Sequence, residues 1–171
     1  MNNIILIGMP SSGKTTLGQI LSNKLNYKFI DTDKLIEELE GISIESMFKI
    51  YGEGYFREKE KQAIDFIKDT NSTIVATGGG LPIYNNNIEK LNNIGVTIFL
   101  EVSLHNLYKR NLNSYIKRPL LEKDKMNSLN KLYKEREKIY KKAHFIVNND
   151  SIEDDTIEEI IKVYKKLNSA L

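Results

Sequence analysis

Gly8-Met9-Pro10-Ser11-Ser12-Gly13-Lys14-Thr15 is the stretch that decides the fold, because it matches the phosphate-binding pattern G-x-x-x-x-G-K-[ST]. The apolar run Ile4–Ile7 comes directly before it and predicts a strand, and Lys14–Leu25 follows with helical spacing. In such a loop, backbone N–H groups wrap phosphate oxygens, the lysine reaches the β- and γ-phosphates, and the threonine hydroxyl takes a Mg²⁺ position. The stretch therefore predicts a site for ATP or GTP.

Apolar runs rich in β-branched residues alternate with helical segments along the rest of the chain. The predicted strands are Ile4–Ile7, Tyr27–Ile30, Thr73–Ala76, Val96–Leu100 and Phe145–Val147. The predicted helices are Lys14–Leu25, Lys34–Glu40, Ile44–Ile50, Tyr55–Lys68, Ile88–Asn93, Leu104–Leu112, Leu129–Lys142 and Glu153–Leu167. Gly41, Gly52 and Gly95 are placed as terminators. Such alternation predicts a parallel sheet with helices on both faces.

The bulk composition narrows the class of protein. A length of 171 residues without repeats or linkers predicts one domain over residues 1–171. Hydrophobic residues make up 40% and charged residues 28%, which is typical of a soluble globular protein. A net charge of +2 gives no global field for nucleic acid or an anionic membrane, so we expect neither as a partner.

The compartment is predicted from what the sequence lacks. Zero cysteines exclude a disulfide framework and a catalytic thiol, which is compatible with a reducing cytosol. No basic residue precedes the first apolar run, and no apolar stretch approaches the ~18 residues of a spanning helix. We therefore expect a cytoplasmic protein.

Two acidic side chains follow the second predicted strand. Asp31 and Asp33 lie where the carboxyl ends of parallel strands border the ligand crevice, beside the phosphate-binding loop. Their spacing of two residues keeps both on one side if the strand persists, so one can order Mg²⁺ through water while the other meets an acceptor hydroxyl. The alternative is an aspartate that caps the helix from Lys34. The pattern alone leaves both roles open.

Three further groups are ambiguous by themselves. Arg57 lies on a helix rich in Lys and Glu and resembles solvated surface. Gly78-Gly79-Gly80 follows a predicted central strand, where it presents bare N–H groups to a ligand or forms a flexible turn. Arg136 lies in the charged helical stretch Tyr133-Lys134-Glu135-Arg136-Glu137-Lys138, where charge pairing along the helix explains it without a function. The stretch from Asn113 to Met126 lacks periodicity and carries Lys117-Arg118-Pro119, which favours a mobile flap.

Taken together, these segments resemble the shikimate kinase family nearly from end to end. The matching motifs, in order, are GMPSSGKTT, FIDTDKLIEELEG, GEGYFREKE, ATGGG, RPLL and YKEREKIYKKA. The resemblance implies a nucleoside-monophosphate-kinase-like P-loop fold: a three-layer α/β/α arrangement whose five-stranded parallel sheet has the order 2-3-1-4-5, with a mobile lid. It implies ATP-dependent phosphorylation of the 3-hydroxyl of shikimate, in aromatic amino-acid and chorismate biosynthesis, by a monomer with Mg²⁺.

The resemblance also implies roles for individual residues. The acceptor would bind in a region of roughly 31–60 and against the glycine triplet, through Asp33, Arg57, Gly78, Gly79, Gly80 and Arg136. ATP would bind through Gly8, Met9, Pro10, Ser11, Ser12, Gly13, Lys14, Thr15, Thr16, Arg110 and Arg118. Lys14, Asp33 and Arg118 would be the catalytic residues, with Arg118 closing from a lid of roughly 112–125, and Asp33 would act as base or orient the hydroxyl. Thr15 would bind Mg²⁺ directly and Asp31 through water.

Two positions depart from the family pattern. Ser11 stands where the family usually has glycine, which puts the local backbone angles in question. Asn149-Asp150-Ser151, after the last predicted strand, lacks the proline often found in the family's adenine loop. No adenine-binding residue is therefore predicted in that loop.

Overall fold

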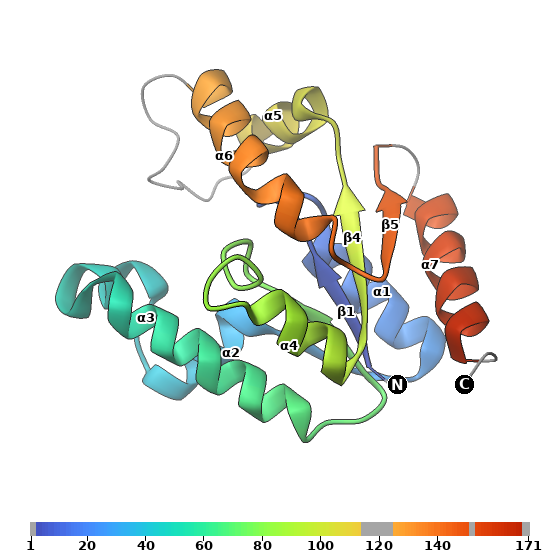
Figure 1. Cartoon of the computed structure of the whole chain (residues 1–171), viewed down its shortest axis with the longest axis horizontal. Coiled ribbons are helices and arrows are strands. Elements are labelled where there is room, and N and C mark those ends of the chain that lie inside the picture. The colour runs from blue at the N-terminus through green and yellow to red at the C-terminus, as the bar shows by residue number, and fades with distance from the viewer. Residues whose placement is uncertain (1–2, 114–124, 151–152, 169–171) are drawn as a thin grey trace.

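A five-stranded parallel sheet forms the centre of the computed structural model, which describes residues 3–113, 125–150 and 153–168 (Figure 1). The strands are β1 (Ile4–Ile7), β2 (Lys28–Asp31), β3 (Thr73–Ala76), β4 (Val96–Glu101) and β5 (Phe145–Asn148). Their order is β2-β3-β1-β4-β5, and every adjacent pair is parallel. The predicted fold class and strand order are confirmed.

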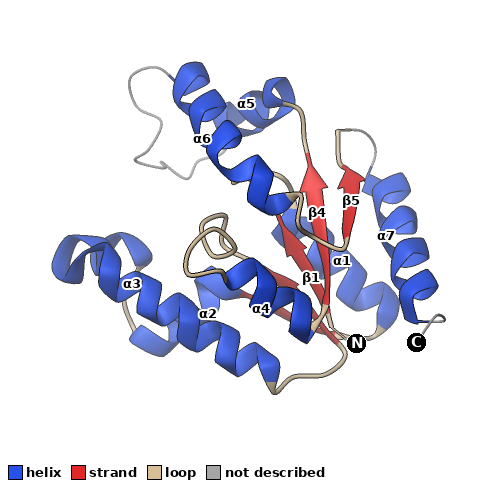
Figure 2. Cartoon of the chain, viewed as in Figure 1, coloured by secondary structure: helices blue, strands red, loops and turns tan. Residues whose placement is uncertain are grey.

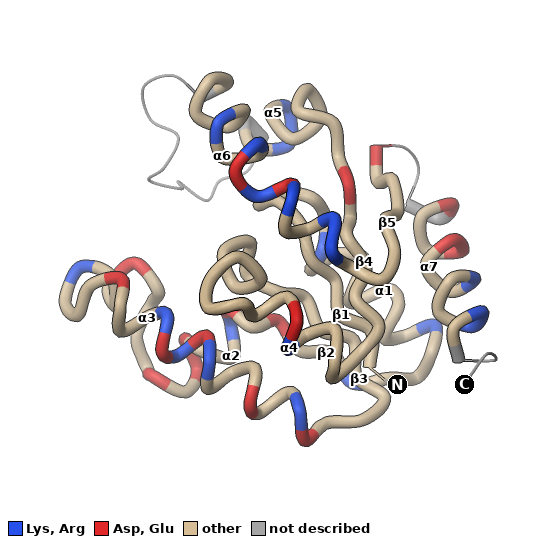
Figure 3. Tube along the Cα trace, viewed as in Figure 1, with Lys and Arg blue, Asp and Glu red and all other residues tan. Residues whose placement is uncertain are grey.

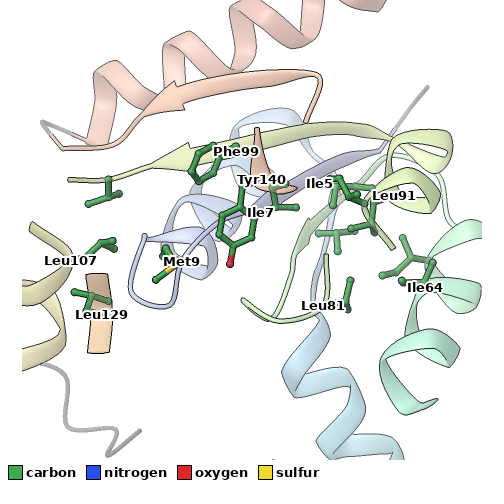
Figure 4. Packing of buried hydrophobic residues seen from close by; sticks show 14 residues of the cluster. Ile5, Ile7, Met9, Ile64, Leu81, Leu91, Phe99, Leu107, Leu129 and Tyr140 are labelled. Atoms are coloured by element: carbon green, nitrogen blue, oxygen red, sulfur yellow. The ribbon is translucent and has the colours of Figure 1, made fainter. Parts of the chain in front are cut away.

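Helices pack on both faces of the sheet, because the strands are apolar on both sides. The helices are α1 (Lys14–Leu25), α2 (Thr32–Glu40), α3 (Ile44–Lys68), α4 (Asn87–Ile94), α5 (Leu104–Asn113), α6 (Lys125–Tyr140) and α7 (Glu153–Asn168). Ile4 and Leu6 of β1 pack in a cluster with α1 and α7, whereas Ile5 and Ile7 pack with α3, α4, α5 and α6 (Figure 4). Successive residues of β1 thus support opposite layers.

Glycines with positive φ interrupt the helices at two of the three positions predicted as terminators, whereas Gly95 ends α4 in an extended conformation. Gly41 ends α2 with φ +68°. Gly52 has φ +78° and ψ 176°, a region that is essentially restricted to glycine, and it kinks α3. The two helices predicted on either side of Gly52 therefore form one kinked element.

The strand order brings the ends of β1, β2 and β3 together at the carboxyl edge of the sheet. β1 lies between β3 and β4, and Asp31 at the end of β2 pairs with Ala76 at the end of β3. The phosphate-binding loop follows β1, and the glycine triplet follows β3 in a loop that coils between α3 and α6 (Figure 2). The phosphate-binding loop, the end of β2 and the glycine triplet, which are far apart in the sequence, thus border the same part of the sheet edge.

Charged residues of both signs are spread over the helices, as Figure 3 shows along α3, α6 and α7. This mixture matches the small net charge of the chain. Within residues 3–113, 125–150 and 153–168, no helix is long and apolar enough to cross a membrane.

Candidate active site

The phosphate-binding loop joins β1 to α1. Gly13 adopts φ +92°, a left-handed conformation that favours glycine, and a Cβ there would lie 2.8 Å from Asn149 Nδ2. Lys14 is buried, and its ammonium group donates to the carbonyls of Gly8 at 3.0 Å and Met9 at 2.7 Å. The loop therefore folds around its own lysine, and α1 begins at that residue, with its N-terminal N–H groups and dipole suited to an anion.

A cleft of about 400 Å³ opens beside this loop and extends to Asp33, Gly78 and Gly79 of the predicted acceptor side, whereas Arg57, Gly80 and Arg136 do not line it. It is lined by Pro10, Ser11, Gly13, Lys14, Thr15, Thr16, Leu17, Asp31, Asp33, Thr77, Gly78, Gly79, Arg110 and Asn149. The predicted nucleotide-binding residues Gly8, Met9 and Ser12 do not line it. Met9 packs in the apolar core, and Ser12 is fully buried with its backbone N–H donating to the Met9 carbonyl at 3.1 Å.

Ser11, which departs from the family pattern, adopts the backbone conformation of a glycine. Its φ of +63° is a left-handed conformation that costs a non-glycine residue roughly 1–2 kcal/mol. Its hydroxyl donates to Asn111 Oδ1 at 3.0 Å, and Asn111 Nδ2 donates to the Leu107 carbonyl at 2.9 Å within α5. The serine therefore keeps the backbone conformation that favours glycine and ties the loop to α5.

Asp31 caps α2, which is one of the two roles left open by the sequence, and it also contacts the phosphate-binding loop. Its Oδ1 accepts the backbone N–H groups of Asp33 at 3.1 Å and Lys34 at 3.4 Å, while Oδ2 accepts the Thr15 hydroxyl at 2.7 Å. The strand ends at Asp31 and α2 begins at Thr32. The strand therefore does not continue to Asp33, as the prediction from the spacing of the two aspartates required. Asp33 instead reaches the cleft from the first turn of α2.

The Thr15 and Asp31 pair fits Mg²⁺ in its chemistry. Both side chains offer hard oxygen ligands, and their contact lies on the wall of the cleft. In the part of the chain that the structure describes, no group of three or more His, Cys, Asp or Glu forms a metal cluster. A hydroxyl and one carboxylate suit a cation whose remaining ligands are phosphate oxygens and water.

Each glycine of the triplet lies against one of the three predicted acceptor-binding side chains. A Cβ on Gly78 would lie 2.2 Å from Asp33 Oδ1. On Gly79 it would lie 3.3 Å from Arg136 Nη1 and 3.0 Å from Pro10 of the phosphate-binding loop, and on Gly80 it would lie 2.9 Å from Arg57 Nη1. The absence of side chains on the triplet thus allows one carboxylate and two guanidinium groups to converge beside the phosphate-binding loop.

Arg57 is largely buried and is not the solvated surface residue that its sequence surroundings indicated. Its side chain is 15% exposed, and its Nη1 donates to Glu60 Oε2 at 2.8 Å. Glu60 is 1% exposed, and burial raises the pKa of its carboxyl, against the lowering effect of Arg57. The charges of Asp33 and Arg136 also act on Glu60, which agrees with their convergence.

Tyr140 connects Arg136 to the glycine triplet. Its hydroxyl donates to the Gly79 carbonyl at 2.6 Å, and its ring packs against Phe99, 5.1 Å between centroids, in the core that Figure 4 shows. Burial raises the pKa of Tyr140 to about 12, so the hydroxyl remains a donor, and the hydrogen bond and charge of Arg136 oppose this rise. Arg136 therefore contacts the buried side chain of Tyr140 on the same helix, α6, in addition to any charge pairing at the surface.

Arg110 and Asn149 also line the cleft. Arg110 Nη2 donates to the Asn149 carbonyl at 2.7 Å. Asn149 is buried, and its Nδ2 donates to the Ser12 carbonyl at 2.8 Å, while its Oδ1 accepts the Thr156 hydroxyl at 3.1 Å. The loop after β5 is thereby fixed to both the phosphate-binding loop and α7.

Sequence reasoning missed three residues of this arrangement: Glu60, Tyr140 and Asn149. Glu60 stands three residues after Arg57, a spacing that indicates a helical pair, but nothing in the sequence marked it as buried. Asn149 lies in the loop for which no residue was predicted. Arg118, together with nearly all of the predicted lid, lies outside the described residues.

A phosphate-binding loop that faces a glycine platform with one carboxylate and two arginines defines a P-loop phosphotransferase for a small anionic acceptor. Comparison with known proteins makes the assignment narrower. The family model described as "SKI: Shikimate kinase" matches residues 10–165. The chain belongs to the shikimate kinase family, as the sequence resemblance predicted.

Individual relatives agree with this assignment. The chain is 52% identical over 167 residues to a shikimate kinase from Clostridium botulinum (strain Okra / Type B1), covering 97% of this chain and 98% of the relative. It is 41% identical over 167 residues to one from Sulfurihydrogenibium sp. (strain YO3AOP1), covering 97% and 99%.

Solved structures agree as well. A shikimate kinase from Acinetobacter baumannii in complex with shikimate has a TM-score of 0.86 at 28% identity, covering 99% of this chain and 94% of that one. A gluconokinase from Sinorhizobium meliloti 1021 has a TM-score of 0.60 at 14% identity, covering 99% and 97%, and shares the fold alone.

Proposed function

We propose that this chain transfers the γ-phosphoryl group of ATP to the 3-hydroxyl of shikimate, giving shikimate 3-phosphate for chorismate and aromatic amino-acid biosynthesis. One observation carries the proposal: the glycine triplet brings Asp33, Arg136 and Arg57 together directly beside the phosphate-binding loop. Shikimate offers a planar carboxylate and ring hydroxyls, which are the groups that two arginines and one aspartate recognise.

The donor half of the reaction is assigned to the phosphate-binding loop and its neighbours. The loop from Gly8 to Thr16 binds the phosphates, and Lys14 neutralises charge on the transferred group. Arg110, on the Asn149 side of the cleft, binds the adenine end of ATP. Arg118 is proposed to complete the cationic set from the lid.

Thr15 is assigned as a direct Mg²⁺ ligand and Asp31 as a ligand through water, on the strength of their 2.7 Å contact at the cleft wall. When bound, Mg²⁺ neutralises the developing charge on the phosphate oxygens. Asp31 also holds the Thr15 hydroxyl and the start of α2 in place, which sets the distance between the donor and acceptor halves.

The acceptor half is assigned to the residues around the triplet. Arg57 and Arg136 bind the carboxylate of shikimate, and the backbone of Gly78, Gly79 and Gly80 supports the ring. Asp33 accepts a hydrogen bond from the reacting hydroxyl, as a base or as an orienting group. In a loose phosphoryl-transfer transition state the proton leaves late, so orientation is the larger contribution expected of Asp33.

The remaining proposals concern the whole chain. We assign residues 1–171 to one domain, with an acceptor-binding region of roughly 31–60 and a lid of roughly 112–125. We also propose a cytoplasmic monomer, which agrees with a cysteine-free biosynthetic enzyme.

An ADP-release assay with ATP and Mg²⁺ tests the function by comparing shikimate, gluconate and nucleoside monophosphates as acceptors. We expect turnover with shikimate, and its absence would overturn the proposal. Arg57→Ala should raise the KM for shikimate by about 100-fold, because a charge-assisted bidentate contact is lost, and should leave the KM for ATP near the wild-type value. Lys61→Ala, which removes an exposed pair with Glu58, is the matched control.

A further inference from the structure

The Arg57 guanidinium group donates three hydrogen bonds along its edge, to Glu53 and Glu60. Nε and Nη2 donate to Glu53 Oε1 at 3.1 and 2.7 Å, and Nη1 donates to Glu60 Oε2 at 2.8 Å. These bonds use three of the five N–H donors of an arginine. One donor therefore remains on each terminal nitrogen, and such a pair matches the two oxygens of a carboxylate.

Tyr84 covers one face of that plane. The centroid of its ring lies 3.6 Å from Arg57 Cζ, well inside the ~6 Å range of a cation–π contact. A Cβ on Gly80 would lie 2.9 Å from Arg57 Nη1 and 3.6 Å from Tyr84 Cε2. The ring, the guanidinium group and the end of the glycine platform therefore meet at one point.

The loop that carries Tyr84 is fixed by its own hydrogen bonds. The N–H of Ile83 donates to the Gly80 carbonyl at 2.9 Å, and the N–H of Asn87 donates to the Tyr84 carbonyl at 2.9 Å. The Asn87 side chain, 1% exposed, donates to the Leu81 carbonyl at 3.0 Å. The position of the ring thus follows from the backbone of the triplet and the start of α4.

The in-plane bonds hold the edge of the Arg57 guanidinium group and leave its faces unsupported. Glu53 is 54% exposed and pairs with Arg57 at a spacing of four residues on α3, a type of pair that contributes little in water. Glu60 fixes one nitrogen but does not prevent the plane from tilting about that bond. A ring in contact with one face opposes the tilt.

We propose that Tyr84 is a positioning residue for the acceptor carboxylate: its ring sets the plane of Arg57 so that the two remaining N–H donors face the substrate. This inference rests on the proposed function, in which Arg57 binds the carboxylate of shikimate. Tyr84 contributes through the arginine and takes no part in phosphoryl transfer.

The test compares Tyr84→Phe, which keeps the ring, with Tyr84→Leu, which keeps an apolar side chain without it. We expect Tyr84→Leu to raise the KM for shikimate by roughly tenfold, the order of a partly desolvated cation–π contact, with little change in kcat or in the KM for ATP. Tyr84→Phe should retain most of the affinity for shikimate. Phe66→Leu, an exposed ring on the same helix as Arg57 but outside the site, is the control and should match the wild type.

Two further measurements separate positioning from general packing. Inhibition by the carboxamide analogue of shikimate should be almost insensitive to Tyr84→Leu, because that analogue lacks the charged group. In an Arg57→Ala background, Tyr84→Leu should add almost no further loss.

The inference is overturned if Tyr84→Phe and Tyr84→Leu lose affinity equally, if the carboxamide responds like shikimate, or if the two losses simply add. If the wild-type chain neither binds nor phosphorylates shikimate, the proposed function fails first.

Discussion

Replacing Gly78 by alanine is expected to push the Asp33 carboxylate out of its place. A Cβ at Gly78 lies 2.2 Å from Asp33 Oδ1, whereas ordinary contact begins at 3.4 Å, so the oxygen must retreat by about 1.2 Å. Gly78 does not have a positive φ, and alanine is therefore compatible with the backbone. Its N–H donates to the buried Thr32 hydroxyl at 2.8 Å, which holds the start of α2 and leaves the Asp33 side chain to move.

The size of the effect follows from that displacement. A misplacement of about 1 Å in a reacting arrangement costs on the order of 100-fold in rate, or about 2.7 kcal/mol. We therefore expect kcat/KM for shikimate to fall about 100-fold in Gly78→Ala, while the KM for ATP stays near the wild-type value. Steady-state ADP release with each substrate varied in turn measures both quantities.

The control is Gly54→Ala, because a Cβ on Gly54 meets no atom within 4 Å. This variant should retain wild-type kinetics and gain slightly in stability, since alanine favours the helical state. In an Asp33→Ala background, Gly78→Ala should cause little additional loss. Wild-type kcat/KM in Gly78→Ala, or an equal loss of affinity for ATP, would refute the reasoning.

Three other perturbations concern stability. Asn111→Ala should lower the free energy of unfolding by about 1 kcal/mol, because it removes the hydrogen bond of Ser11, and the loss should shrink in a Ser11→Gly background. Urea denaturation measures both, and equal losses would contradict the assigned bond. Gly52→Ala should cost about 1–3 kcal/mol from backbone strain alone, although a Cβ there meets no atom within 4 Å; a neutral result would contradict the assigned conformation. Partial burial lowers the pKa of His144, so the unfolded chain binds the proton more readily: the melting temperature should fall as pH drops below 6.5, and His144→Gln should flatten this dependence. An unchanged pH dependence of the melting temperature in His144→Gln would contradict that assignment.

Local patterns predicted the features that depend on neighbouring residues. The phosphate-binding loop, the five strands and the glycine breaks could be predicted because backbone conformation and side-chain periodicity are set within a few residues. The break at Gly52 is one example, since its conformation is restricted to glycine whatever packs nearby. The family, too, was evident from motifs in order.

The acceptor side could not be predicted in the same way, because its residues meet only through the packing of separate elements. Arg57 and Arg136 have the sequence surroundings of surface charges, and only the triplet loop between α3 and α6 brings them together. The position of Asp33 was argued from a strand that in fact ends at Asp31, where the carboxylate caps α2.

By itself, the sequence determined the donor loop, the order of the elements and the family, because these are properties of consecutive residues. Only the tertiary structure decided which charged side chains belong to the site and what holds them: Glu60 and Tyr84 at Arg57, Tyr140 at the triplet, and Asn149 beneath the phosphate-binding loop. The physical reason is burial. A charge or hydrogen bond becomes directional and strong when packing removes it from water, and that packing joins residues that are distant in the chain.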